Sequence, residues 1–286
     1  MPEMPEVDAL VGFLRERCVG AVVADIELAS FAVLKTFDPP VSAYTGLAVT
    51  GVSRHGKFID IEVDGLHLVI HLAKAGWIRW SDQLADKRLK MGNGPIAMRL
   101  RLDAGDGPHL GFDLTEAGTR KGLAVYTVRD PQEVPGIAAL GPDPLAEGFE
   151  LRPLLARKMQ VKRLLRDQKI IAGIGNAYSD EILHAARLSP FAIAEQLDDH
   201  EVARLESAVH DVLTEAMAAS AGKPASELKD SKRARMRVHG RAGETCDVCG
   251  DTIAEVVFAD SSLQYCPTCQ TGGKPLKNRS TSKFLK

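Results

Sequence analysis

Four cysteines have the spacing of metal ligands. Two residues separate Cys246 from Cys249, two separate Cys266 from Cys269, and sixteen residues lie between the pairs. Because each pair can offer two thiolates to one tetrahedral ion, the pattern predicts one structural zinc ion in a zinc ribbon. The alternative is a redox-active CxxC pair, but the βαβ context of such a motif is absent. Four thiolates leave no open coordination position, so we expect the metal to fold a hairpin rather than to catalyse a reaction.

The N-terminus offers a second candidate reactive group. If Met1 is removed, the chain begins with the secondary amine of Pro2, and the carboxylate of Glu3 follows directly. An α-amino group titrates near ~8, far below a lysine side chain at ~10.4, so a usable fraction is neutral and nucleophilic at physiological pH. The same residues also fit an ordinary solvated chain end.

A glycine-rich turn precedes a helical pattern in the second half of the chain. It reads Ala172-Gly173-Ile174-Gly175-Asn176. Backbone N–H groups at the start of a helix and the positive end of its dipole favour a phosphate, and asparagine can both cap the helix and donate to an anion. The alternative is an ordinary helix cap without a ligand.

Basic residues gather in the second half. The chain has 36 Lys+Arg and 38 Asp+Glu, and its net charge is −2. Residues 1–150 hold 15 basic and 21 acidic side chains (−6), and residues 151–286 hold 21 and 17 (+4). Residues 152–187 alone hold eight basic side chains, including Lys162, against three acidic ones. This segment predicts a phosphate-binding face, with a solvated helix face as the alternative.

Residue periodicity divides the chain into a β-rich part and a helical part. Alternation with period two predicts strands, and apolar residues at helical spacing predict helices. The predicted strands are 59–63, 66–72, 98–102 and 124–128, and the predicted helices are 5–19, 151–159, 161–169, 178–186 and 199–218. Residues 131–144 are rich in Pro and Gly, which predicts a linker. Residues 223–237 are expected to form a polar connector. Cys18 lies on the apolar stripe of the first helix, so we expect it to be packed rather than reactive.

Composition places the chain among globular proteins. With 286 residues, 45% hydrophobic and 26% charged, it can form two modest domains and differs from disordered, collagenous or membrane-spanning chains. No apolar run approaches the roughly 20 residues of a transmembrane helix. The first ten residues lack the regions of a secretory signal. We therefore expect a cytoplasmic protein with no membrane partner.

Five motifs occur in one order along the chain. They are PE-PEV at the N-terminus, Gly56-Lys57-Phe58, LLRDQKIIAGIGNAYSDEIL, VHGRAGETC and CxxCG…CPTCQ. Together they resemble the formamidopyrimidine-DNA glycosylase/endonuclease VIII (Fpg/Nei) family, from Pro2 to Gln270. The resemblance implies an α+β fold, in which an N-terminal antiparallel β-sandwich domain with a flanking helix precedes a helix-two-turns-helix domain with a zinc ribbon hairpin.

The resemblance also implies domain boundaries. The expected parts are a catalytic β domain (1–130), a linker (131–150), a helix-two-turns-helix DNA-binding domain (151–237), a four-cysteine zinc finger (238–270) and a basic tail (271–286). The tail holds five basic and no acidic residues. It is either a further DNA contact or a disordered solubilising tail.

The activity implied by the resemblance is that of a base-excision-repair DNA glycosylase with abasic-site (AP) lyase activity. Pro2 matches the family's nucleophile, which attacks C1′ of the damaged nucleotide, expels the base and forms a Schiff base that permits β- and δ-elimination. Glu3 matches the carboxylate that shuttles a proton to the opening sugar, and Glu6 matches the second acid of the motif. The implied partner is damaged double-stranded DNA, bound by a monomer associated with the nucleoid.

Other matches concern the DNA backbone. Lys57 matches a β-domain lysine that holds a phosphate flanking the lesion. Asn176, with the amides of Gly173 to Gly175, matches the family's phosphate clamp, and we also assign Lys162 to DNA binding. Phosphates held on both sides stabilise an extruded nucleotide, which a terminal amine can then reach.

Several departures from the family pattern bear on the substrate. Ser261 stands where the zinc hairpin presents an arginine, which removes a charge-assisted phosphate contact. Lys74 and Lys121 stand where the family has apolar wedges, and we expect both, with Arg120, to contact DNA. A glycine–threonine segment associated with the oxidised-purine lid is absent from Ala219 to Lys229. These changes disfavour 8-oxoguanine as a substrate, and the alternative function is a non-catalytic or lyase-only protein of the same fold that binds damaged DNA.

Overall fold

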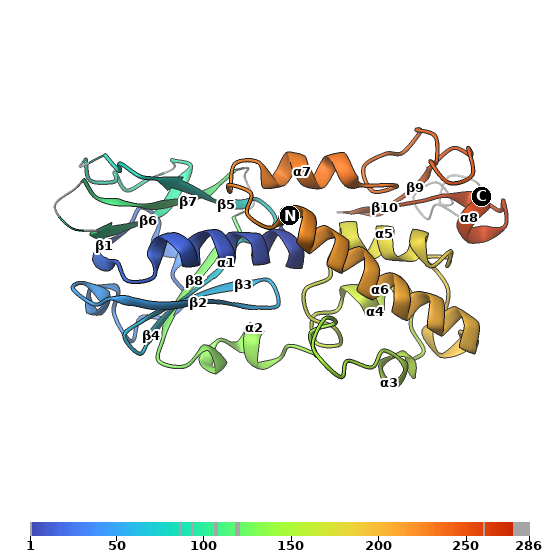
Figure 1. Cartoon of the computed structure of the whole chain (residues 1–286), viewed down its shortest axis with the longest axis horizontal. Coiled ribbons are helices and arrows are strands. Elements are labelled where there is room, and N and C mark those ends of the chain that lie inside the picture. Colours follow the sequence, from blue (N-terminus) through green and yellow to red (C-terminus); the bar gives the residue numbers. More distant parts are fainter. Residues whose placement is uncertain are drawn as a thin grey trace. The chain divides into compact units, whose positions relative to one another are not determined.

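A computed structural model of the chain describes residues 2–85, 87–92, 94–103, 105, 108–117, 121–259 and 261–276. Its contacts divide the chain into two compact units, which we describe one at a time (Figure 1). The first comprises Met1–Ala139 with Ser220–Lys229, and the second comprises Leu140–Ala219 with Asp230–Lys286. The first division, after Ala139, falls inside the predicted linker.

Two four-stranded antiparallel sheets form the first unit. Their strand orders are β1-β6-β7-β5 and β2-β3-β4-β8. The unit contains α1 (Met4–Cys18), β1 (Val22–Leu28), η1 (Phe31–Val33), η2 (Val41–Tyr44), β2 (Val49–His55), β3 (Phe58–Val63), β4 (Leu66–His71), β5 (Gly76–Ser81), β6 (Ile96–Asp103), β7 (Leu110–Glu116), β8 (Ala124–Val128), η3 (Pro131–Glu133) and α2 (Pro135–Ala138). The predicted β-sandwich with a flanking N-terminal helix is thus confirmed.

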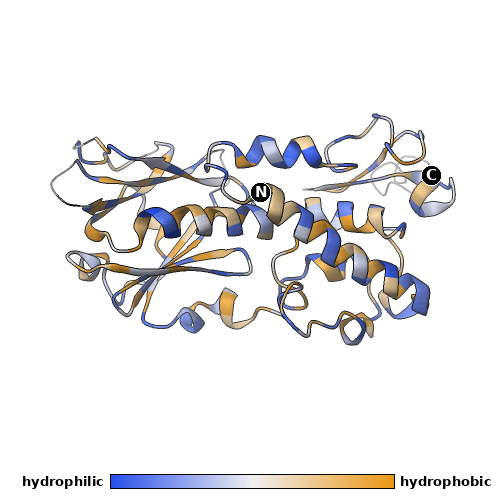
Figure 2. Cartoon of the chain, in the orientation of Figure 1, coloured by the Kyte–Doolittle hydropathy of each residue, from blue (hydrophilic) through white to orange (hydrophobic). Residues whose placement is uncertain are grey.

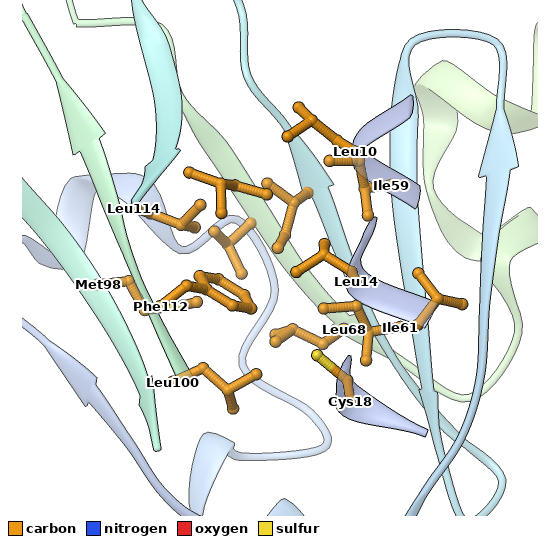
Figure 3. Packing of buried hydrophobic residues seen from close by; sticks show 14 of the residues in the cluster. Leu10, Leu14, Cys18, Ile59, Ile61, Leu68, Met98, Leu100, Phe112 and Leu114 are labelled. Carbon is orange, nitrogen blue, oxygen red and sulfur yellow. The ribbon is translucent and has the colours of Figure 1, made fainter. Parts of the chain in front are cut away.

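Apolar side chains of α1 and of both sheets fill one core. Leu10 and Leu14 of α1, Ile61 of β3 and Phe112 of β7 are buried to 1% exposure or less, and Figure 3 shows them pointing into a common interior. Side chains alternate between the two faces of a strand, so each sheet gives one apolar face to this interior. Cys18 is also buried there, and burial raises the pKa of its thiol to about 12. It is a packing residue, as predicted.

Helices dominate residues 140–219 of the second unit. They are α3 (Arg152–Leu155), α4 (Val161–Arg166), α5 (Asn176–Ala185), η4 (Ala194–Gln196) and α6 (Asp199–Ser220). The helix predicted at 151–159 is much shorter, because the backbone around Met159 and Val161 bonds instead to Ala194 N and Ala192 O. No helix in the described part of the chain is long and apolar enough to cross a membrane.

The four-cysteine segment forms a hairpin followed by one helical turn. β9 (Ala254–Val257) pairs antiparallel with β10 (Ser262–Tyr265), and α8 (Pro267–Thr271) follows. One face of the hairpin is packed by a small apolar cluster of Val256, Leu263 and Tyr265 with Phe191, Ala254 and Leu276. The predicted zinc ribbon hairpin is therefore present.

A helix, α7 (Leu228–Arg235), occupies part of the connector that was predicted without secondary structure. Figure 2 shows that it is mostly hydrophilic, so it lacks the apolar spacing by which helices are recognised. The segment before it and the first residue of the helix pack within the first unit. Ala225 and Leu228 belong to that unit's core, and Trp77 Nε1 donates to Ala225 O at 3.1 Å.

Candidate DNA-binding site and zinc centre

Reciprocal hydrogen bonds order the start of α1. Glu3 is the N-cap and Glu6 the third helical residue, and each carboxylate accepts the backbone N–H of the other, with Glu3 N to Glu6 Oε2 at 2.9 Å. This capping box leaves the two residues 2% and 1% exposed, and Pro2 is buried as well. The structure thus brings both predicted acids together beside the predicted nucleophile.

Lys57 and His71 lie at one end of the second sheet. Lys57 is in the turn between β2 and β3 and is 7% exposed. His71 is opposite Phe58 in the β3–β4 ladder, with 4.6 Å between the ring centroids. Burial, together with the positive charge of Lys57, lowers the pKa of His71 to about 4, so its imidazole is neutral at pH 7. We did not select His71 from the sequence, although its place beside the Gly56-Lys57-Phe58 turn was a usable signal.

The loop lysines make different contacts. Lys74 is exposed in the turn between β4 and β5. Lys121 donates its Nζ to Glu116 O at 2.7 Å, and the Glu116 carboxylate accepts two backbone N–H groups of the same loop. The ammonium of Lys121 is therefore held at the end of β7. Arg120 lies outside the described residues, so its DNA contact stays a prediction.

The glycine-rich turn leads directly into α5. Gly175 is the N-cap, and Asn176 is the first helical residue. Gly173 has a φ of 88°, which favours glycine. Its N–H donates to Gln168 Oε1 at 2.9 Å. We had predicted that this amide binds a phosphate, but it is engaged within the protein. Asn176 donates Nδ2–H to Ser262 O at 2.8 Å, which links the turn to the hairpin and uses one of its two amide donors.

The prediction that Lys162 contacts DNA needs correction. The residue is 4% exposed, and its Nζ lies 2.6 Å from Asp180 Oδ1, 2.8 Å from Ser179 Oγ and 3.2 Å from Asn176 O. A lysine ammonium has three donors, and these three contacts direct it inward. Lys162 therefore fixes the start of α5, including the residue predicted to hold a phosphate.

Two acidic residues of α5 hold the connector before the zinc finger. Asp180 is fully buried, and its Oδ2 lies 2.7 Å from His239 Nδ1. Glu181 accepts the backbone N–H groups of Arg237, Val238 and His239 at 2.7, 3.0 and 2.8 Å. Burial raises the pKa of Glu181, although the three N–H donors oppose this rise. The start of the VHGRAGETC motif is thus anchored to α5 by its backbone.

The four predicted cysteines form the metal centre. The Sγ atoms of Cys246, Cys249, Cys266 and Cys269 all lie within 4.8 Å of one another. A tetrahedral zinc with Zn–S bonds of ~2.3 Å places its sulfurs about 3.8 Å apart, and the pairs Cys246–Cys269 and Cys249–Cys266 are 3.9 and 3.3 Å apart. His184 Nε2 packs 3.4 Å from Cys246 Sγ. These thiolates hold one structural zinc ion.

Models of known protein families match each part of this architecture. The formamidopyrimidine-DNA glycosylase N-terminal domain matches residues 1–119, its H2TH domain matches 140–227, and the zinc finger found in FPG and IleRS matches 243–272. A formamidopyrimidine-DNA glycosylase of Desulforamulus reducens is 31% identical over 287 residues, which are 94% of this chain and 99% of the relative. An uncharacterized formamidopyrimidine-DNA glycosylase-like protein of Mycobacterium tuberculosis is 53% identical over 150 residues, which are 52% of this chain and 95% of the relative.

Solved structures agree over nearly the whole chain. The MutM (FPG) protein from Thermus thermophilus superposes with a TM-score of 0.77 at 31% identity, covering 96% of this chain and 100% of that one. Lactococcus lactis Fpg, non-covalently bound to DNA containing an AP site, gives 0.80 at 25% identity, covering 94% and 99%. Since three family domains occur in order and relatives match along their full length, the chain belongs to the Fpg/Nei family of DNA glycosylases.

Proposed function

We propose that this protein is a base-excision-repair DNA glycosylase and AP lyase whose nucleophile is the amine of Pro2. The observation that carries the proposal is the capping box at the start of α1, which holds Glu3 and Glu6, both almost fully buried, within one helical turn of that amine. Removal of Met1 exposes the amine. The reaction needs one nucleophile and one proton shuttle, and both lie in this turn.

In the proposed reaction, the Pro2 nitrogen bonds to C1′ as the bond from C1′ to the base breaks. The electron pair leaves with the base, which takes up a proton, and the Pro2 nitrogen loses its own proton so that its lone pair is free again. Glu3 gives a proton to the ring oxygen as its bond to C1′ opens, which leaves an iminium between protein and sugar. Loss of a C2′ proton then expels the 3′ phosphate by β-elimination, and a further elimination expels the 5′ phosphate.

The partner in this proposal is damaged double-stranded DNA, bound by a monomer. Lys57 and the remaining Asn176 amide donor each hold a phosphate, and the neutral His71 beside Lys57 adds a hydrogen-bonding group without further charge. Such contacts hold an extruded nucleotide against its tendency to restack.

We further propose that 8-oxoguanine is not the preferred lesion, and that abasic sites, oxidised pyrimidines or bulky lesions are. MutM has been solved with DNA containing carbocyclic 8-oxo-G. In this chain the segment that would carry the purine lid is packed in the first unit instead. Ala225 is buried, Trp77 donates to its carbonyl, and Lys229 Nζ lies 4.4 Å from the centre of the Trp77 ring.

Borohydride trapping on DNA containing an abasic site tests the lyase proposal. The wild-type protein should give a covalent adduct, which Pro2→Gly and a form that retains Met1 should lose. Pro5→Ala is the matched control, because Pro5 lies in the same first turn but carries no free amine, and it should keep the adduct. A wild-type protein that gives no adduct refutes the proposal.

The rival function, a non-catalytic or lyase-only protein that binds damaged DNA, is favoured by Ser261, which removes a cation from the hairpin. It predicts tight binding to lesion-containing duplexes without base release. Incubation with a panel of abasic, 8-oxoguanine, oxidised-pyrimidine and bulky-lesion duplexes separates the functions by the products formed. Rapid release of 8-oxoguanine would overturn the substrate proposal.

A further inference from the structure

The zinc hairpin ends in an exposed aromatic side chain beside Ser261. Phe258 N donates to Ser261 O at 2.8 Å, so the two residues close the hairpin opposite each other. Phe258 and its neighbour Val257 are 38% and 41% exposed. Neither belongs to the apolar cluster that packs the hairpin's buried face. Exposed apolar side chains at the end of the hairpin leave a surface that a partner can cover.

This surface is continuous with the glycine-rich turn. Val257 pairs with Ser262 across the hairpin, and Ser262 O accepts the Asn176 Nδ2–H at 2.8 Å. The exposed pair is therefore one cross-strand pair away from the residue proposed to hold a phosphate. A nucleic acid bound at the turn is thus the partner that the position of this surface favours.

We propose that Phe258 stacks on an unstacked nucleobase of the damaged DNA. This inference rests on the proposed DNA-binding function and adds a contact to it. Aromatic side chains stabilise unstacked bases of any sequence through their π faces, and apolar wedges favour the unstacked state. Ser261, at the end of the hairpin, carries no charge and cannot make the phosphate contact expected of an arginine there. A stack between Phe258 and a base would replace that charged contact with one that does not involve a phosphate.

Salt dependence distinguishes the two kinds of contact. Phe258→Ala should weaken binding to a duplex with an uncleavable abasic analogue about tenfold, which corresponds to the loss of one aromatic–base stack. The slope of log K against log salt should stay unchanged, because no phosphate contact is lost. Phe258→Trp should retain the affinity, and Ser261→Arg should steepen the slope by ~0.9. Phe31→Ala, which removes a phenyl group 62% exposed in the first unit, is the matched control and should bind like the wild type.

A fluorescent base reports the stacking directly. With 2-aminopurine opposite the abasic analogue, binding of the wild type should quench the fluorescence, and Phe258→Ala should quench it less. Zinc content of one ion per chain shows that the variant hairpin is folded. Wild-type affinity of zinc-loaded Phe258→Ala overturns the proposal, and so does a loss of affinity with a shallower salt slope. Borohydride trapping of the wild type reports the amine of Pro2, so its failure refutes the lyase proposal, whereas the binding measurements on an uncleavable duplex test Phe258 without any chemical step.

Discussion

Two buried helices of this protein are stabilised by opposite chemistry. The buried face of α1 in the first unit is apolar beyond its first turn, and Leu10, Leu14 and Cys18 are all fully buried. In the middle of α5 in the second unit, polar residues are buried instead, with Asp180 fully buried and Glu181 only 5% exposed. The first helix is held by removal of apolar area from water. The second also buries Ile182 and Leu183, but it adds specific hydrogen bonds and an ion pair made by its buried carboxylates.

This difference has consequences for tolerance and for function. Apolar burial is non-directional, so a core accepts side chains of similar volume. A buried charge needs a partner at one place, and the loss of that partner is costly. The partners of α5 are Lys162, the backbone of residues 237–239 and β10. The polar contacts of α5 therefore fix the glycine-rich turn and the connector before the zinc finger, whereas the apolar face of α1 anchors the start of the chain to the core of the first unit.

Zinc removal should give the largest difference between the units. Structural zinc contributes about 10–16 kcal/mol in zinc-finger peptides, so Cys266→Ser or a strong chelator should unfold the hairpin and abolish DNA binding. Both tryptophans, Trp77 and Trp80, belong to the first unit, so its unfolding transition, followed by tryptophan fluorescence, should stay unchanged. Cys18→Ala is the control for the loss of a cysteine that is not a zinc ligand, and atomic absorption should show its full zinc content. A fluorescence transition that shifts on chelation would mean that the units do not differ in this way.

Removal of one buried charge should give the next largest effect. Asp180→Asn keeps the shape of the side chain but leaves the Lys162 ammonium buried without its carboxylate, and we expect a loss of about 3–5 kcal/mol in the second unit. The double variant Asp180→Asn/Lys162→Met should recover a large part of this loss. Urea unfolding followed by zinc release measures it. Asp211→Asn, at an exposed position of α6, is the control and should change little, whereas a double variant no more stable than Asp180→Asn would refute the ion-pair explanation.

The same contrast explains what could be predicted from the sequence. Apolar periodicity identifies α1, β3 and β4, because their apolar residues recur at the spacing of a helix or a strand. The zinc ligands are equally recognisable, since only two residues separate the two cysteines of each pair. The capping box was also readable, with Glu3 and Glu6 at the required spacing, although we assigned these residues only chemical roles.

The polar contacts of the second unit could not be predicted in this way. Lys162 was assigned to DNA because it lies among basic residues that predict a phosphate-binding face, and its partner Asp180 is eighteen positions away. The helix α7 was missed because its sequence, LKDSKRAR, has no apolar stripe. Both errors have one physical origin, since a specific tertiary contact leaves no local period in the sequence.

A core substitution should reverse the pattern of the zinc and charge variants. Leu14→Ala removes a fully buried side chain between α1 and both sheets, and we expect a loss of about 2–5 kcal/mol in the first unit. Leu14→Met should cost less than about 1.5 kcal/mol, because it nearly conserves volume. Tryptophan fluorescence in urea measures both. The zinc content and the zinc-release transition should match the wild type, and a shift in zinc release would show that the two units unfold together.

The smallest effect should come from His71, a partly buried ionisable side chain of the first unit. Its pKa is about 4 when folded and near ~6.5 when unfolded, so the unfolded chain binds more protons between these values. The contribution of His71 is therefore fully present above pH ~6.5 and is lost as the pH falls toward 4, by roughly 2 kcal/mol between pH 7 and pH 5. His71→Phe should remove this loss from the tryptophan-detected unfolding curve, and His210→Phe, at an exposed position of α6, should keep it. If wild type and His71→Phe lose stability in parallel, the acid sensitivity of the first unit has another source. If they diverge, the stability of the first unit also depends on a polar group at one place, because the half-buried His71 ring beside Lys57 must stay neutral.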